Sequence, residues 1–141
     1  MRRIFIVRKD LNMSTGKISA QLSHCAELYW LHKIQNELFK GEDKYYADLI
    51  FDINEVEKYI NGSIVKTVCQ AKNLRHLLKA KTLAEELGLK EGYDFGFIND
   101  KCLTELEPEN EDGTTTTAFW TKPLEDEIAH KISKKYHLYI G

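Results

Sequence analysis

The chain has 141 residues, of which 43% are hydrophobic and 30% are charged, and its formal net charge is −2. This length buries one good core and not two, and the composition excludes a disordered chain. The small net charge leaves nucleic-acid binding open, because phosphate binding depends on where lysine and arginine cluster. We therefore expect one folded domain over residues 1–141.

The first third of the chain predicts a strand followed by a long helix. The β-branched and aromatic run from Ile4 to Val7 reads as a buried strand that ends in a polar turn. Ser14 or Thr15 can cap the helix, which we expect to extend to about residue 39. Apolar residues recur along it at helical spacing, at Ile18, Leu22, Cys25, Tyr29, Ile34 and Leu38.

Residues 39–60 have a mixed pattern, and we interpret them as an inserted segment with one brief helix near 54–59. The turn dipeptide Asn61-Gly62 ends this segment. Four further elements follow it in the order strand, helix, strand, strand, and a helix closes the chain. The predicted ranges are 63–69, 71–87, 93–98 and 115–120, with the last helix from Pro123 to about 134.

Alternating strands and helices in this order predict an α/β fold of two or three layers. We favour a single-domain α/β/α sandwich around a mixed sheet of about four strands. The two late strands have no helix between them, so at least one antiparallel pair is expected. Residues at the carboxyl ends of strands are then the first candidates for chemistry.

One face of the first helix carries polar residues that can address a ligand. Lys17, Gln21 and His24 are spaced i, i+4 and i+7, so they share that face. Gly16 and Lys17 also lie in the opening turn, where free backbone N–H groups favour an anion such as phosphate or an oxyanion. The alternative interpretation is that these side chains simply face water. The turn is not a P-loop, because Ile18 stands where that motif has serine or threonine.

Asp100 follows a strongly β segment, which places it at the carboxyl end of a strand. Such a position suits a catalytic or ligand-orienting carboxylate. Asn99-Asp100 is also good turn chemistry in any protein, so a purely structural role stays open. The same two interpretations apply to Thr104 and Thr117.

Other chemical motifs are absent from the sequence. There is no G-x-S-x-G nucleophile elbow, and the histidines lack metal-ligand spacing. Cys25, Cys69 and Cys102 lie far apart without a C-x-x-C pair, so we expect free thiols, no metal and a cytoplasmic location. The basic start of the chain has too short an apolar run for a signal peptide, and no membrane span is expected.

Three segments carry a resemblance to a known family. The runs Ile6-Val7-Arg8-Lys9-Asp10-Leu11-Asn12-Met13 and Gly16-Lys17-Ile18-Ser19-Ala20-Gln21-Leu22-Ser23-His24 resemble the opening of type-2 peptidyl-tRNA hydrolases. Residues 98–108 resemble the family's I-x-D-A-G-R-T-Q-I-A-P loop through Asp100, Thr104 and Pro108. Thr117 falls where the family has a threonine that opens its last strand.

The resemblance implies hydrolysis of the ester between a peptide and tRNA, with peptidyl-tRNA as partner, no cofactor and a possible homodimer. By position it implicates Lys17, Asp100, Thr104 and Thr117 as the catalytic residues. Gly16, Gln21 and His24 are implicated in substrate binding. Lys17 would then hold a phosphate or the oxyanion, and Asp100 would position and deprotonate water.

The chain departs from the family pattern between the two implicated residues Asp100 and Thr104 and just beyond them. Where the family has Ala-Gly-Arg-Thr-Gln, residues 101–105 read Lys-Cys-Leu-Thr-Glu, and an acidic stretch follows at 109–112. We expect Lys101 to pair with Glu105, because an unpaired carboxylate beside a tRNA site is costly. Two alternatives remain: a non-catalytic RNA- or ligand-binding module, and a hydrolase of another small ester or amide.

Overall fold

A five-stranded mixed sheet forms the centre of the computed structural model, which describes all residues from Met1 to Gly141. In spatial order its strands are β5 (Phe95–Asp100), β6 (Thr115–Thr121), β1 (Arg2–Arg8), β4 (Val65–Ala71) and β7 (His137–Leu138). β1 is parallel to β4 and antiparallel to β6, and β5 is antiparallel to β6. The carboxyl ends of β1, β4 and β5 therefore meet at the same end of the sheet. The prediction of about four strands omitted the two-residue β7.

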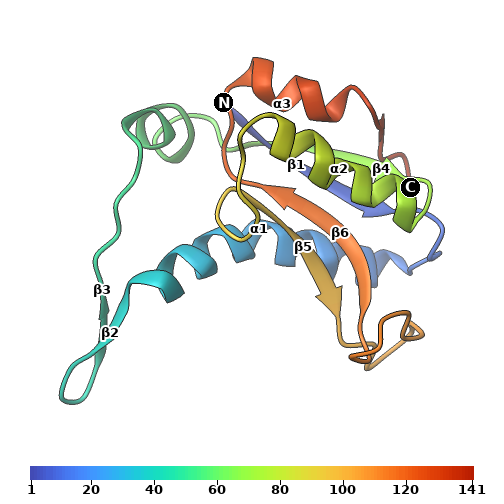
Figure 1. Cartoon of the computed structure of the whole chain (residues 1–141), viewed down its shortest axis with the longest axis horizontal. Coiled ribbons are helices and arrows are strands. Elements are labelled where there is room, and N and C mark those ends of the chain that lie inside the picture. The colour runs from blue at the N-terminus through green and yellow to red at the C-terminus, as the bar shows by residue number, and fades with distance from the viewer.

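Helices cover both faces of the sheet, which confirms the predicted α/β/α sandwich (Figure 1). The long helix α1 (Thr15–Glu37) covers one face, and α2 (Leu74–Glu86) and α3 (Asp126–Ser133) cover the other. No helix of the structure has the length and apolar character needed to cross a membrane.

Strand β1 shows how the sequence creates two cores. Successive side chains of a strand point to opposite faces of the sheet. Phe5 and Val7 accordingly pack toward α1, and Ile4 and Ile6 pack toward α2 and α3. All four side chains are at most 2% exposed, and burial of each contributes about 1.5–3 kcal/mol of hydrophobic free energy. A short apolar run with no polar break is thus required at the centre of the sheet.

Gly96 in β5 is required by a large neighbour. A Cβ atom at this position would lie 2.7 Å from Cζ2 of the fully buried Trp120 on the adjacent strand. The absence of a side chain leaves room for the indole beside the backbone of β5. Trp120 is therefore a core residue, as predicted from the sequence.

Residues 38–60 leave the sheet and return. A small hairpin of β2 (Leu38–Lys40) and β3 (Tyr45–Ala47) extends away from the body of the molecule (Figure 1). The π-helix η1 (Glu55–Ile60) follows and confirms the predicted brief helix. Tyr29 of α1 donates a hydrogen bond to the buried Glu55 carboxylate at 2.5 Å, and this contact ties η1 to the body.

Two helix starts differ from the sequence prediction for clear reasons. α2 begins at Leu74 and not at 71, because the Asn73 side chain accepts a hydrogen bond from the backbone N–H of His76 and caps the helix. α3 begins at Asp126 and not at Pro123. Leu124 exchanges two backbone hydrogen bonds of 2.9 Å with Arg2, which keeps the chain extended to that point.

Candidate active site

The closest opposite charges at the carboxyl end of β5 belong to Lys17 and Asp100. Nζ of Lys17 lies 2.9 Å from Oδ2 of Asp100, and the two side chains are only 13% and 11% exposed. The same Nζ donates a hydrogen bond of 3.0 Å to Oγ1 of Thr104. Helix α1 begins beside the end of β5, so residues distant in the chain meet at one point. The structure thus brings together three of the four predicted catalytic residues.

Gln21 joins this pair to the fourth residue, Thr117. Gln21 is fully buried, and its Nε2 donates to Oδ2 of Asp100 at 3.1 Å. Thr117 Oγ1 donates to Oε1 of Gln21 at 2.5 Å. The alternative that this helix face merely contacts water is therefore wrong for Lys17 and Gln21.

A β-bulge aims Thr117 at Gln21. The pairing of β5 with β6 runs from Ile98↔Ala118 directly to Asn99↔Thr116, so Thr117 has no partner on β5. An extra residue in one strand changes the alternation of side chains. Thr117 can consequently face α1, together with Ala118, although the two are neighbours in the sequence.

Cys102 completes the set of donors around Asp100. Its backbone N–H donates to Oδ1 of Asp100 at 2.8 Å. This geometry needs a left-handed backbone at Cys102, where φ is +59°, a conformation that costs a residue with a side chain about 1–2 kcal/mol. The family pattern has glycine at this position, and glycine adopts a left-handed backbone readily. A glycine is the one sequence signal that could have indicated this role, and this chain has cysteine instead. The contact was not predicted.

The pKa of Asp100 lies below the usual aspartate value. Partial burial raises the pKa, but hydrogen bonds from Lys17, the Cys102 N–H and Gln21 outweigh it. The carboxylate is therefore ionised at neutral pH. Both of its oxygens are held by donors, which fixes its orientation.

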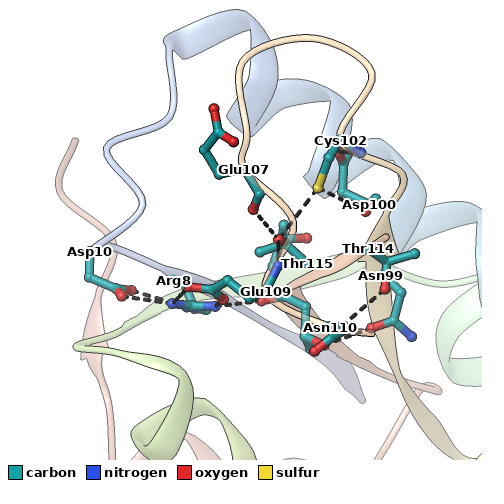
Figure 2. A network of polar contacts seen from close by, with 12 residues as sticks. Arg8, Asp10, Asn99, Asp100, Cys102, Glu107, Glu109, Asn110, Thr114 and Thr115 are labelled. Carbon is teal, nitrogen blue, oxygen red and sulfur yellow. Dashed lines mark hydrogen bonds and ion pairs between the residues drawn. The ribbon is translucent and has the colours of Figure 1, made fainter. Parts of the chain in front are cut away.

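Hydrogen bonds and ion pairs hold the loop from 101 to 114 against the sheet near Asp100 (Figure 2). Thr115 Oγ1 donates to the Glu107 carbonyl at 2.6 Å and accepts from the Glu109 N–H at 3.0 Å. The guanidinium of Arg8, at the end of β1, pairs with both Asp10 and Glu109. Arg8 is only 3% exposed, so this ion pair anchors the acidic stretch instead of leaving all its charge in solvent. This role of Arg8 was not predicted from the sequence.

Glu105 has a different partner from the one predicted. Its carboxylate accepts hydrogen bonds from the backbone N–H of Ser14 at 2.8 Å and from Oγ of Ser14 at 2.7 Å. These two bonds, followed by the nearby Lys17 charge, lower the pKa of Glu105. Lys101 is exposed and forms no ion pair with it, so the expected Lys101–Glu105 pair is wrong. Ser14, at the opening of α1, therefore stabilises the Glu105 carboxylate in place of Lys101.

The two other predicted residues lie at the margin of this cluster. Gly16 is exposed in the opening turn of α1, with open space around the position that a Cβ atom would take. His24 is exposed two turns further along and forms no hydrogen bond within the chain. Their roles in substrate binding stay predictions. No group of three or more His, Cys, Asp or Glu side chains is placed to hold a metal ion.

A separate cavity of about 560 Å³ lies near the other end of α1, where His32 and Lys122 are among its lining residues. It contains none of the predicted site residues. We therefore place the candidate site at the Lys17–Asp100 pair, where the polar groups converge, and not in this cavity.

Replacement of Gln21 by leucine should raise the pKa of Asp100, because one of the hydrogen bonds that lower it is lost. Leucine has a similar volume and suits a buried position. A depressed carboxylate pKa stabilises the fold above the unfolded pKa of about 3.9, and this stability is lost as pH falls through the folded pKa. On acidification, the variant should therefore begin to lose stability at a higher pH than the wild type does. NMR titration of the Asp100 carboxyl carbon measures the shift directly.

Gln35→Leu on the exposed side of the same helix is the matched control and should leave the Asp100 titration unchanged. An unaltered Asp100 pKa in Gln21→Leu would mean that the amide contributes only packing.

A single-domain α/β sandwich with a lysine–carboxylate pair and two threonines at one end of its sheet presents polar groups of the kind that hydrolases use. Comparison with known proteins gives the family. A family model described as peptidyl-tRNA hydrolase PTH2 matches residues 1–139. The chain belongs to this peptidyl-tRNA hydrolase family, whose members are ester hydrolases.

Curated relatives are similar over nearly their whole length. A peptidyl-tRNA hydrolase of Thermococcus sibiricus is 31% identical over 134 residues, covering 94% of this chain and 92% of the relative. One from Sulfolobus acidocaldarius is 34% identical over 118 residues, covering 84% and 83%. One from Thermoplasma acidophilum is 28% identical and covers 97% of both chains.

Proposed function

We propose that this protein hydrolyses the ester that joins a peptide to the 3′ end of tRNA. The observation that carries the proposal is the convergence of Lys17 and Gln21 on Asp100, with Thr104 accepting a hydrogen bond from Lys17, in a chain of the peptidyl-tRNA hydrolase family. Lys17 and Asp100 are the proposed catalytic pair. Thr104 and Thr117 are the proposed partners that hold Lys17 and Gln21 in place.

The proposed chemistry needs a base for water and a cation for the developing negative charge. Asp100 orients a water molecule and accepts its proton as the water oxygen attacks the ester carbonyl. Lys17 stabilises the oxyanion of the tetrahedral intermediate. When Lys17 turns to the oxyanion, Asp100 loses its strongest donor, so its pKa rises and it becomes a better base. As the intermediate collapses, Asp100 returns the proton to the leaving 3′ oxygen, which gives a tRNA with a free 3′ hydroxyl. The peptide acid that forms ionises to a carboxylate at neutral pH.

The test is turnover of peptidyl-tRNA by the purified protein, with release of the peptide followed over time. Parallel assays use aminoacyl-tRNA and a small carboxylic ester. We expect hydrolysis of peptidyl-tRNA and none of the small ester at equal concentration. Binding of tRNA without turnover would instead support a non-catalytic module, and turnover of the small ester alone would support a hydrolase with another substrate.

We further propose that the protein acts as a homodimer in the cytoplasm. Its cysteines are free thiols, as suits a reducing compartment. The hairpin side chains Phe39, Tyr45 and Tyr46 are at least half exposed, and a second copy would bury such an apolar surface. Light scattering should give twice the monomer mass, and a monomer mass at micromolar concentration would contradict the dimer.

A further inference from the structure

We propose that the cavity of about 560 Å³ near the far end of α1 is a second ligand site, and that it binds a protonated primary amine attached to an apolar group. Glu55, the first residue of η1, is the proposed partner of the ammonium. The cavity shares no residue with the cluster of Lys17, Asp100 and Gln21, so this inference goes beyond the proposed function and does not depend on it.

Glu55 is a buried carboxylate that has no cationic partner in the chain. The residue is 4% exposed and lines the cavity. Tyr29 donates a hydrogen bond to its Oε1, whereas Oε2 takes part in no hydrogen bond or ion pair. Burial and this hydrogen bond raise the pKa of Tyr29, so the phenol keeps its proton and the negative charge stays on Glu55. A buried charge without a partner is costly, and a cation at Oε2 would remove that cost.

The lining of the cavity as a whole favours a cation. Its residues carry five carboxylates and three cationic groups, which is a net charge of −2 when histidine is neutral. The cationic groups already have other contacts. Lys122 pairs with Asp94 at 2.9 Å, the amino terminus pairs with a carboxylate of α3, and Nζ of Lys33 lies 4.8 Å from the centre of the Phe51 ring. None of them neutralises Glu55.

The size and the remaining walls of the cavity indicate an organic amine and not a metal ion. No three His, Cys, Asp or Glu side chains are placed to hold a metal, and the volume lies within the range of about 300–1,000 Å³ that small organic ligands occupy. Leu87, Leu89 and Leu124 give the cavity an apolar wall, and the rings of Tyr29 and Tyr93 attract an ammonium through their π faces. A free aromatic amine and the amino terminus of a peptide share this chemistry.

The experiment measures binding of 2-phenylethylamine to the full chain by isothermal titration calorimetry at neutral pH. 2-Phenylethanol has the same apolar group without the charge. Two tripeptides that begin with phenylalanine, one with a free and one with an acetylated amino terminus, distinguish the two sources of the amine. Each ligand is titrated into the wild type, Glu55→Gln and the control Glu27→Gln. Glu27 is an exposed carboxylate on the opposite side of α1 and forms no ion pair.

We expect the wild type to bind 2-phenylethylamine about 10-fold or more tightly than 2-phenylethanol, and Glu55→Gln to lose about 10-fold or more in affinity for the amine. Glutamine has the shape of glutamate, and its amide oxygen can still accept the hydrogen bond from Tyr29, so the loss reports the charge. Glu27→Gln should bind within about 2-fold of the wild type, because its charge faces solvent and is screened. Without ligand, Glu55→Gln should melt at a temperature no lower than the wild type does, since an unpaired buried charge has been removed.

Equal affinity for the amine and the alcohol would overturn the inference, and so would equal affinity of the two glutamine variants or no binding of any amine by the wild type. A melting temperature of Glu55→Gln well below that of the wild type would also overturn it, because Glu55 would then serve the fold. NMR of the wild type gives a test that needs no variant: the backbone amide signals of Glu55, Leu89 and Tyr93 should shift during the amine titration, and shifts confined to other residues would contradict the site.

The comparison of the two amines identifies the source of the ligand. Tighter binding of the tripeptide with a free amino terminus than of 2-phenylethylamine, together with loss of binding on acetylation, indicates a peptide. The reverse order indicates a small free amine. Neither result depends on turnover of peptidyl-tRNA, so failure of the proposed function and failure of this inference are separate outcomes.

Discussion

Asp100→Asn should lower kcat for peptidyl-tRNA hydrolysis by about 10²–10⁴-fold, with KM changed much less. An amide keeps the shape of the side chain but cannot accept the proton of the attacking water, and general-base catalysis typically contributes a factor of this size. At 25 °C the loss corresponds to about 3–5 kcal/mol of transition-state stabilisation. The measurement is steady-state turnover at saturating and at limiting substrate.

The Asp100→Asn variant should remain folded, because the amide has the shape of the carboxylate and the residue lies at the end of β5. Asp48→Asn removes the same charge at an exposed position without a polar contact, and it should retain wild-type turnover. A kcat for Asp100→Asn within a factor of about 3 of the wild type would remove Asp100 from the mechanism.

Lys17→Met should lower kcat/KM by about 10²–10³-fold, as is typical when one donor to a developing oxyanion is removed. Methionine keeps most of the apolar stem, so the packing of the side chain should be preserved. The variant also leaves the Asp100 carboxylate without its cationic partner, which raises the pKa of Asp100. The acid limb of the pH–rate profile should therefore move to higher pH.

Lys101→Met is the matched control for Lys17→Met, because Lys101 follows Asp100 in the chain but is exposed and forms no ion pair. Its turnover should stay within about 2-fold of the wild type at moderate salt. Lys17→Arg separates charge from position. If arginine restores tRNA binding but not kcat, the ammonium position matters for chemistry, and full recovery by arginine would indicate that only its charge is used.

The helices and central strands were predictable because their signals are local. The apolar run of β1, the helical spacing along α1 and the brief helix at η1 each depend on residues close together in sequence. The misplaced starts of α2 and α3 depend on a cap at Asn73 and on the pairing of Leu124 with Arg2. The second of these contacts joins opposite ends of the chain, and no local pattern reports it.

The residues of the candidate site were predicted from the sequence, but the hydrogen bonds and ion pairs among them were not. Helical spacing placed Lys17 and Gln21 on one face, and the preceding β segment made Asp100 a candidate. The family resemblance implicated Thr104 and Thr117. The left-handed backbone of Cys102 and the partner of Glu105 were missed or wrong. Both depend on how the loop after β5 folds back onto the opening of α1, which periodicity cannot describe.

The sequence by itself determined the alternation of elements, the two faces of β1 and the polar face of α1, because each follows from the repeat of a helix or a strand. Only the tertiary structure decided that a bulge opposite Ile98 and Asn99 turns Thr117 toward Gln21, and that Arg8 holds the acidic loop. Strand register and buried ion pairs are set by the packing of segments distant in the chain. Their geometry exists only once the sheet and the helix are assembled.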